Sequence, residues 1–364
     1  MTSRTSAPTT SRWQRIGFRS GFLLLAACAT RPPQPDELSA LPRVPSPESG
    51  TYARVSDVPP DPVIARVISA YHYDASLGGA AAGLALQAAR GTGGYTPWEV
   101  RESAWRAGWP YPVSQLRAWQ TEAGAPPPDA LTAWLAGLPE GQSVGLVRVR
   151  AETADSWVGL SAAPALDLGT IRRLMQLGET IRLPAVAGAV LVVGDPVGAV
   201  HDYPLDAPVP VPLDRAGEWI FDVRLANATV ARFPVYVDMI PPKLDLFAVD
   251  GLPDDPAARA EALVGMVREA YGGAPWRRDR TLDSVATSAL DDPIDVAGAA
   301  GRLGFDRAAT AAWSCDAPTV EGCLDAVIWR PEARRAFLLD NELLGLAVRA
   351  TAERVRIEAV VAPE

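Results

Sequence analysis

Lysine and histidine are almost absent from this sequence. The chain holds one lysine, Lys243, and two histidines, so arginine carries nearly all of its positive charge. The formal net charge of −9 argues against nucleic acid as a partner, because a phosphate backbone is bound by a basic surface. The histidines, His72 and His201, are too few for a zinc site built from imidazole ligands. A Ser-His-Asp triad stays open, since geometry and not chain order defines it, but we expect no nucleophile elbow of the Gly-x-Ser-x-Gly kind.

Long apolar runs are scarce, and the run near the N-terminus, Gly21–Ala27, is too short to span a bilayer as a helix. It follows a stretch with several arginines and ends at Cys28. This order of basic, apolar and small residues predicts a signal peptide over residues 1–27. Leu25-Ala26-Ala27-Cys28 resembles the lipobox of bacterial lipoproteins, which implies lipidation of Cys28 and a membrane anchor. An ordinary cleaved signal peptide is the alternative.

Residues 28–60 are rich in proline and serine and predict a flexible tether. Ala29, and not an aspartate, follows Cys28, which by analogy with common sorting rules favours the outer membrane over the inner membrane. The expected location is therefore the cell envelope, with the lipid-anchored chain facing the periplasm or the cell surface.

Cysteine is rare, and the two residues other than Cys28 lie close together at Cys315 and Cys323. An exported protein sits in an oxidising compartment, so this pair predicts a disulfide. Two buried free thiols are the alternative, because cysteine packs as a small apolar residue. A zinc site is less well supported, since the neighbourhood offers few further soft ligands.

Hydrophobic patterning divides the rest of the chain into three parts. Residues 61–165 show helical spacing and then alternation, which predicts helices followed by a β-hairpin. Within them, Thr96-Pro97-Trp98-Glu99 has the N-cap, proline and glutamate of a helix start. Residues 168–242 alternate in short runs separated by turns and predict a small β-sandwich. Residues 255–364 predict helices and two closing strands, so the fold class is α+β and multidomain.

The first and third parts share an order of helices followed by a hairpin. Arg106-Ala107-Gly108-Trp109 is similar to Arg302-Leu303-Gly304-Phe305, and Val144–Arg148 is similar to Leu344–Val348. A diverged duplication on either side of the sandwich is one interpretation. Chance similarity in a chain rich in alanine, arginine and valine is the other.

The third part resembles the CAP superfamily, the cysteine-rich secretory, antigen 5 and pathogenesis-related-1 proteins. Four segments carry the resemblance: the opening helix Arg259–Tyr271, Leu282–Ala286, the line Pro331–Asp340, and the strand Leu344–Val348. The resemblance covers roughly the last third of the chain. It implies a C-terminal α-β-α sandwich in an exported protein, with disulfides and an interaction role.

The departures from the CAP pattern concern its metal site. The family cleft usually carries two histidines and two glutamates that can hold a divalent metal, but residues 255–364 contain no histidine. Arg334 stands where the bacterial line has histidine, and no Gly-Glu-Asn line occurs between Gly301 and Cys315. The family's metal site therefore transfers to no residue here, and we expect no catalytic residue, no metal and no cofactor.

Other candidate sites have plain structural alternatives. His72 beside Asp74 suits either catalysis or a helix end. The aspartates of 291–295 and of 245–255 suit either calcium or helix caps and solvated loops. The tryptophans between Trp98 and Trp134 suit either a carbohydrate or peptide platform or core packing. The glycines of 91–94 lack the residues that follow a phosphate loop and predict a plain loop.

These observations favour an envelope-tethered lipoprotein with a non-catalytic binding or scaffold role. Its expected partners are the membrane, reached through the lipid on Cys28, and an envelope protein, the cell wall or a lipid. Two alternatives remain open: a hydrolase that uses carboxylates, and a carrier of a lipid or small apolar ligand. The hydrolase predicts a concave site with convergent carboxylates of raised pKa.

Overall fold

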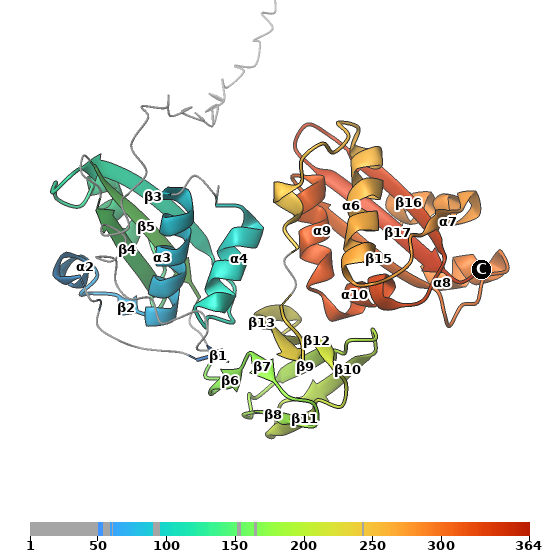
Figure 1. The fold of residues 1–364 in the computed structure, drawn as a ribbon, viewed down its shortest axis with the longest axis horizontal. Helices are drawn as coiled ribbons and strands as arrows, with labels where there is room; N and C mark the ends of the chain where they lie inside the picture. The colour runs from blue at the N-terminus through green and yellow to red at the C-terminus, as the bar shows by residue number, and fades with distance from the viewer. Residues whose placement is uncertain are drawn as a thin grey trace, which may run out of the picture. The chain divides into compact units, whose positions relative to one another are not determined.

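The computed structural model describes residues 50–53, 59, 61–89, 95–150, 154–163, 166–241 and 244–364 (Figure 1). The predicted signal peptide, Cys28, nearly all of the tether and the glycines of 91–94 lie outside the described residues. Helices and strands are both abundant, which confirms the α+β class.

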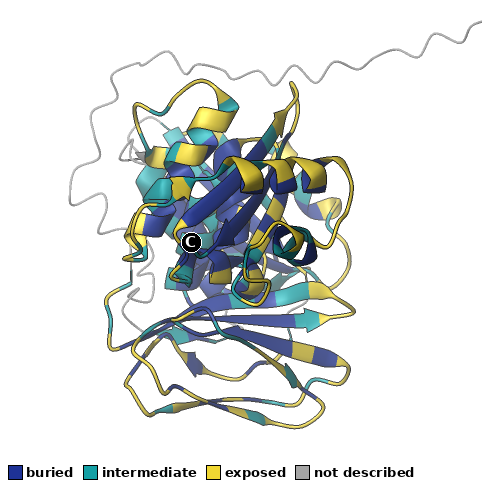
Figure 2. Ribbon diagram, turned by 90° about the vertical axis from the view of Figure 1, so that its right-hand side faces the viewer, coloured by how far each residue is buried: buried dark blue, intermediate teal, exposed yellow. Residues whose placement is uncertain are grey.

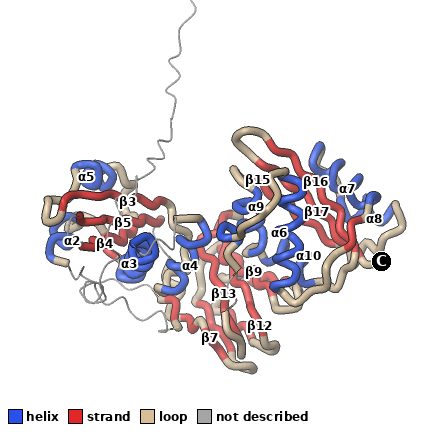
Figure 3. Tube along the Cα trace, turned by 45° about the horizontal axis from the view of Figure 1, so that its top comes forward, coloured by secondary structure: helices blue, strands red, loops and turns tan. Residues whose placement is uncertain are grey.

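The N-terminal body is a mixed sheet with helices on both faces. Its helices are α2 (Pro62–Val67), α3 (Ala75–Ala89), α4 (Pro97–Arg106) and α5 (Asp129–Ala136). Its strands are β2 (His72–Tyr73), β3 (Gln115–Glu122), β4 (Ser143–Arg150) and β5 (Ala154–Ala162), in the order β2-β4-β5-β3. Helices α3 and α4 pack in one hydrophobic cluster, while α2 and α5 pack in another that includes Trp157 (Figure 3). The capping box predicted at Thr96 and Glu99 is present at the start of α4.

The C-terminal body is built in the same way. Its helices are α6 (Pro256–Ala270), α7 (Arg280–Asp291), α8 (Val296–Arg302), α9 (Val320–Ile328) and α10 (Pro331–Leu338). Its strands are β14 (Arg277–Arg278), β15 (Ala311–Ala317), β16 (Leu343–Ala350) and β17 (Val355–Ala362), in the order β14-β16-β17-β15. The strands form a buried layer between helices whose outer faces are exposed (Figure 2).

The two bodies share strand order, strand direction and local hydrogen bonding. In each, the first strand runs parallel to the third, and the remaining pairs are antiparallel. The amide of Trp109 donates to the carbonyl of Ala104, and the amide of Phe305 donates in the same way to that of Ala300. Gly108 and Gly304 both adopt positive φ angles, +89° and +99°. The C-terminal body adds one helix, α10, between α9 and β16.

A glycine in the third strand of each body lets a helix cross the sheet at close range. A Cβ on Gly145 would lie 2.2 Å from the carbonyl carbon of Leu77 in α3. A Cβ on Gly345 would lie at the same 2.2 Å from that of Leu282 in α7. Neither distance is possible for a real side chain, so both positions require glycine.

Between these bodies in the chain order lies a β-rich unit. Its main sheet has the order β10-β9-β12-β13-β7, and a ribbon pairs β8 with β11. The strands are β7 (Leu174–Met175), β8 (Thr180–Leu183), β9 (Ala189–Gly194), β10 (Val200–Pro204), β11 (Val209–Pro212), β12 (Gly217–Leu225) and β13 (Ala228–Val237). A short pair joins β1 (Thr51–Tyr52) to β6 (Ile171–Arg172). The proline-rich β11 pairs with one strand, as expected for an edge.

The structure differs from the sequence expectations at His72 and at two strands. The predicted helix end at His72 is wrong, because His72 lies in β2 and α2 ends at Val67. The strands β3 and β15 were not predicted. Strand β3 does not alternate clearly between apolar and polar residues, and β15 alternates only over the short stretch Trp313–Ala317. Among the described residues, no helix combines the length and the hydropathy needed to cross a bilayer.

Candidate functional site

A pocket of about 690 Å³ opens where the C-terminal body meets the β-rich unit. Its walls come from β12 and β13, the end of α7, β15, the start of α10, and β17. Six charged side chains line it: Arg224, Arg232, Arg330, Arg356, Glu332 and Glu358. We call this site the arginine pocket. The whole pocket lies within the compact part of the chain formed by Pro33–Glu364.

Helix α10 forms one wall of the arginine pocket and contacts the β-rich unit. Arg330 is its N-cap residue, and Pro331 at the first helical position suits a helix start. Two glycines of the β-rich unit receive the helix closely. A Cβ on Gly194 would lie 3.1 Å from Pro331, and one on Gly198 would lie 3.3 Å from Arg335. Gly194 at the end of β9 and Gly198 in the following turn therefore allow α10 to pack closely against the β-rich unit.

Ion pairs join α10 to β12 at the pocket rim. Arg224 binds the carboxylate of Glu332 with two hydrogen bonds of 2.5 and 2.9 Å. It also donates to the buried Asp222, to which Arg232 donates at 2.7 Å. Burial of Glu332 acts to raise its pKa, but the hydrogen bonds from Arg224, a backbone hydrogen bond and the charges of Arg224 and Arg232 together lower it. Glu332 is therefore held in its ionised form.

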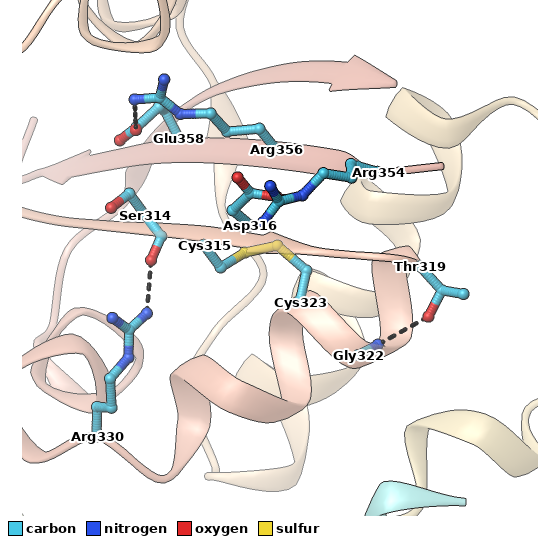
Figure 4. Close-up of a disulfide and its surroundings, with 10 residues drawn as sticks. All are labelled: Ser314, Cys315, Asp316, Thr319, Gly322, Cys323, Arg330, Arg354, Arg356 and Glu358. Atoms are coloured by element: carbon cyan, nitrogen blue, oxygen red, sulfur yellow. Dashed lines mark hydrogen bonds and ion pairs between the residues drawn. A yellow bond between two sulfur atoms is a disulfide. The ribbon is translucent and has the colours of Figure 1, made fainter. Parts of the chain in front are cut away.

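Arg330 differs from the other arginines of the pocket. One of its terminal nitrogens donates to the carbonyl oxygen of Ser314 at 2.5 Å (Figure 4). Within the described residues, no carboxylate lies within 4.0 Å of its guanidinium. Burial lowers its pKa, and the positive charge of Arg232 lowers it further. Glu332 and Asp222 partly offset this lowering, so Arg330 is a partly buried cation among charges of both signs.

The opposite wall carries Arg356 and Glu358 on β17. They are two residues apart on one face of the strand, and Arg356 donates to Glu358 at 3.0 Å (Figure 4). Burial raises the pKa of Glu358, although Arg356 partly offsets that effect. The pocket therefore contains one carboxyl group of lowered pKa and one of raised pKa.

A disulfide lies beside the Ser314 that anchors Arg330. Cys315 of β15 is bonded to Cys323 of α9, with a Cα–Cα distance of 5.3 Å. Both cysteines are buried, and the bond ties the strand to the helix that precedes α10 (Figure 4). It therefore braces the backbone on which Arg330 depends.

Arg334 of α10 takes part in a buried ion pair. Its guanidinium lies 2.7 Å from the carboxylate of Glu218 in β12 and 4.8 Å from the ring centre of Tyr271. The side chains of Arg334 and Glu218 are 3% and 2% exposed. A cation held in this way links the C-terminal body to the β-rich unit and cannot act as a metal ligand.

The histidines and the aspartates proposed from the sequence do not line the arginine pocket. His201 is exposed on β10. Asp245, Asp255 and Asp295 cap η2 (Leu246–Ala248), α6 and α8, which fits the structural alternative for these aspartates. Among the described residues, no group of three or more histidine, cysteine or carboxylate side chains is placed to hold a metal. The aromatic platform is not formed by Trp105 and Trp109, which are 3% and 0% exposed.

One enzyme-like motif was missed in the sequence. Gly141-Gln142-Ser143-Val144-Gly145 has the Gly-x-Ser-x-Gly spacing of a nucleophile elbow, which requires an exposed serine on a strand-to-helix turn. Here Ser143 begins β4, is fully buried, and its hydroxyl has no hydrogen-bond partner in the described structure. The serine is therefore not an activated nucleophile.

The arginine pocket itself was also missed. Its arginines come from β12, β13, the α9–α10 junction and β17, and no local spacing connects them. The available signal was compositional, namely the near-exclusive use of arginine for positive charge.

Comparison with known protein families, with curated proteins and with solved structures finds no match to this chain.

Proposed function

We propose that this chain is an envelope-tethered lipoprotein with a non-catalytic binding role, and that the arginine pocket is its binding site. The observation that carries the proposal is the pocket itself. It is open, lined by four arginines, and most of its carboxylates are already engaged by those arginines. Preorganised guanidinium groups favour recognition of a ligand over proton transfer, since arginine stays charged at neutral pH.

The resemblance to the CAP superfamily supports this proposal, and we extend it to both bodies. The helix–strand order of the C-terminal body agrees with an α-β-α sandwich. The N-terminal body repeats its strand order and its close glycine crossing. We infer a duplicated and degenerate CAP-like frame on either side of a small sandwich, in which Arg334 has replaced a metal ligand by a structural cation.

A carboxylate-based hydrolase is the second candidate, and one observation favours it. Glu332 and Glu358 line the same pocket and have pKa values shifted in opposite directions. Such a pair is typical of an acid and a base. The engagement of Glu332 by two hydrogen bonds from Arg224 argues against it, because a catalytic carboxylate needs a free oxygen.

The test uses the full-length lipoprotein isolated from its own envelope and analysed by native mass spectrometry. The variant Ala312→Trp places a large side chain in the pocket, at an exposed strand position. Ala350→Trp is the matched control, an exposed strand position of the same sheet outside the pocket. We expect a bound mass that survives in the control and is lost in Ala312→Trp.

A bound mass that persists in Ala312→Trp would place the ligand elsewhere and overturn the proposal. Incubation of the isolated protein with its envelope extract separates the two candidates. Release of a product that stops in Glu358→Gln would establish the hydrolase, because glutamine removes the proton of raised pKa while keeping the shape of the side chain.

A further inference from the structure

The charges of the arginine pocket do not balance locally. Asp222 and Glu332 are bound by Arg224 and Arg232, and Glu358 is bound by Arg356. This leaves Arg330 without a carboxylate within 4.0 Å among the described residues. A partly buried cation beside other cations is unfavourable unless an anion compensates its charge.

The surroundings of Arg330 are suited to such an anion. The hydrogen bond to Ser314 fixes one terminal nitrogen, and the carbonyl oxygen that accepts it lies on a strand braced by the disulfide (Figure 4). Arg330 also caps α10 without a side-chain acceptor for the first-turn amides of that helix. The start of α10 adds partial positive charge, which Glu332 in its first turn compensates in part.

We propose that the arginine pocket binds the phosphate group of a larger ligand, with Arg330 as its principal contact. This inference rests on the proposed function and names the ligand class. A planar carboxylate is satisfied by one guanidinium fork. Arg330, together with the terminal nitrogens of Arg232 and Arg356 that bind neither Asp222 nor Glu358, offers donors from three elements to an anion with several oxygens. The pocket volume of about 690 Å³ leaves room for the remainder of the ligand.

The N-terminal body lacks the parts of this site. It has no counterpart of α10 between α5 and β4, so it has no equivalent of Arg330. When the two sheets are aligned at Gly145 and Gly345, Ser156 of β5 falls at the position that Arg356 occupies in β17. The phosphate site therefore belongs to the C-terminal body alone, and a single site per chain is expected.

The experiment measures binding of inorganic phosphate to the full chain by isothermal titration calorimetry at constant ionic strength. The variants are Arg330→Gln, Ala312→Trp and the exposed control Arg302→Gln. We expect saturable binding at one site, weakened about tenfold or more in Arg330→Gln, as for the loss of a charge-assisted hydrogen bond. Arg302→Gln should bind like the unaltered chain, and Ala312→Trp should not bind.

Further probes identify the source of the phosphate. Tighter binding to vesicles containing phosphatidylglycerol than to inorganic phosphate, lost in Arg330→Gln, would support the proposal with a lipid headgroup as ligand. Equal affinity would support it with a soluble phosphorylated ligand. Binding of acetate but not phosphate would overturn it, as would phosphate binding that Arg330→Gln leaves unchanged. If phosphate does not bind while Ala312→Trp still loses the envelope ligand, this inference fails and the proposed function stands.

Discussion

The ion pair between Arg334 and Glu218 makes a quantitative prediction about how the C-terminal body is held. Both side chains are almost fully buried, and their charged atoms lie 2.7 Å apart. Replacing Arg334 by methionine keeps a similar length but leaves the carboxylate of Glu218 without its partner. Removal of one partner of a buried pair costs about 3–5 kcal/mol, so we expect the free energy of unfolding to fall by that amount.

The double variant Glu218→Gln, Arg334→Met isolates the pair. Replacing both charges removes the uncompensated group, so most of the lost stability should return. The control is Arg354→Met, which disrupts the exposed pair with Asp316 and should cost less than about 1 kcal/mol. Urea unfolding at pH 7, followed by tryptophan fluorescence and circular dichroism, measures all of these variants.

The same pair gives a pH dependence whose sign is fixed. Burial raises the pKa of Glu218, and Arg334 offsets that effect. A carboxyl group with a raised pKa in the folded state contributes stability at low pH that is lost as pH rises through that pKa. Without Arg334, the remaining neighbours of Glu218 are Tyr236, Glu102 and Arg173. The deficit of Arg334→Met should therefore be larger at pH 8 than at pH 5, and a deficit that is small and independent of pH would refute this reasoning.

The remaining predictions concern packing, the disulfide and metals. Gly145→Ala and Gly345→Ala should each destabilise the fold by about 1–3 kcal/mol or more, because the added Cβ would collide with the helix that crosses the strand. Gly265→Ala is the control, since its Cβ would meet no neighbour. Equal melting temperatures for all three variants would contradict the close packing of helix and strand. Cys315→Ser should cost about 2.5 kcal/mol on the loop-entropy model for a separation of 8 residues, and free thiols in the unreduced protein would show that no disulfide forms. Elemental analysis of the full chain after exposure to zinc, calcium and manganese should find no stoichiometric metal, and a tightly bound equivalent would contradict the absence of a ligand cluster from the described residues.

The fold was predictable where patterns are local. The capping residues Thr96 and Glu99 and the alternation before and after residue 153 identified a helix and a hairpin that the structure contains. Strand β15 was missed because its alternation covers only the short stretch Trp313–Ala317, in which Trp313 and Cys315 are buried and Ser314 and Asp316 are exposed. The two-residue strands β2 and β14 were also missed, since they are defined by pairing with distant strands and not by their own composition.

The shared topology of the two bodies was partly visible in short sequence matches. Val144–Arg148 and Leu344–Val348 occupy the same strand of the two sheets, and Gly108 and Gly304 adopt the same backbone conformation. The arginine pocket was not predictable, because its arginines converge only when α10 contacts the β-rich unit through Gly194 and Gly198. Tertiary contacts of this kind produce no periodic pattern in the sequence.

The most direct test of the proposed function is native mass spectrometry of the full-length protein isolated from the cells that produce it. We predict acyl groups on Cys28 together with one non-covalently bound, phosphate-containing ligand, which is retained in Ala350→Trp and absent from Ala312→Trp. A protein that carries no ligand in either form, or one whose ligand is unaffected by Ala312→Trp, would contradict the assignment of the arginine pocket as the binding site.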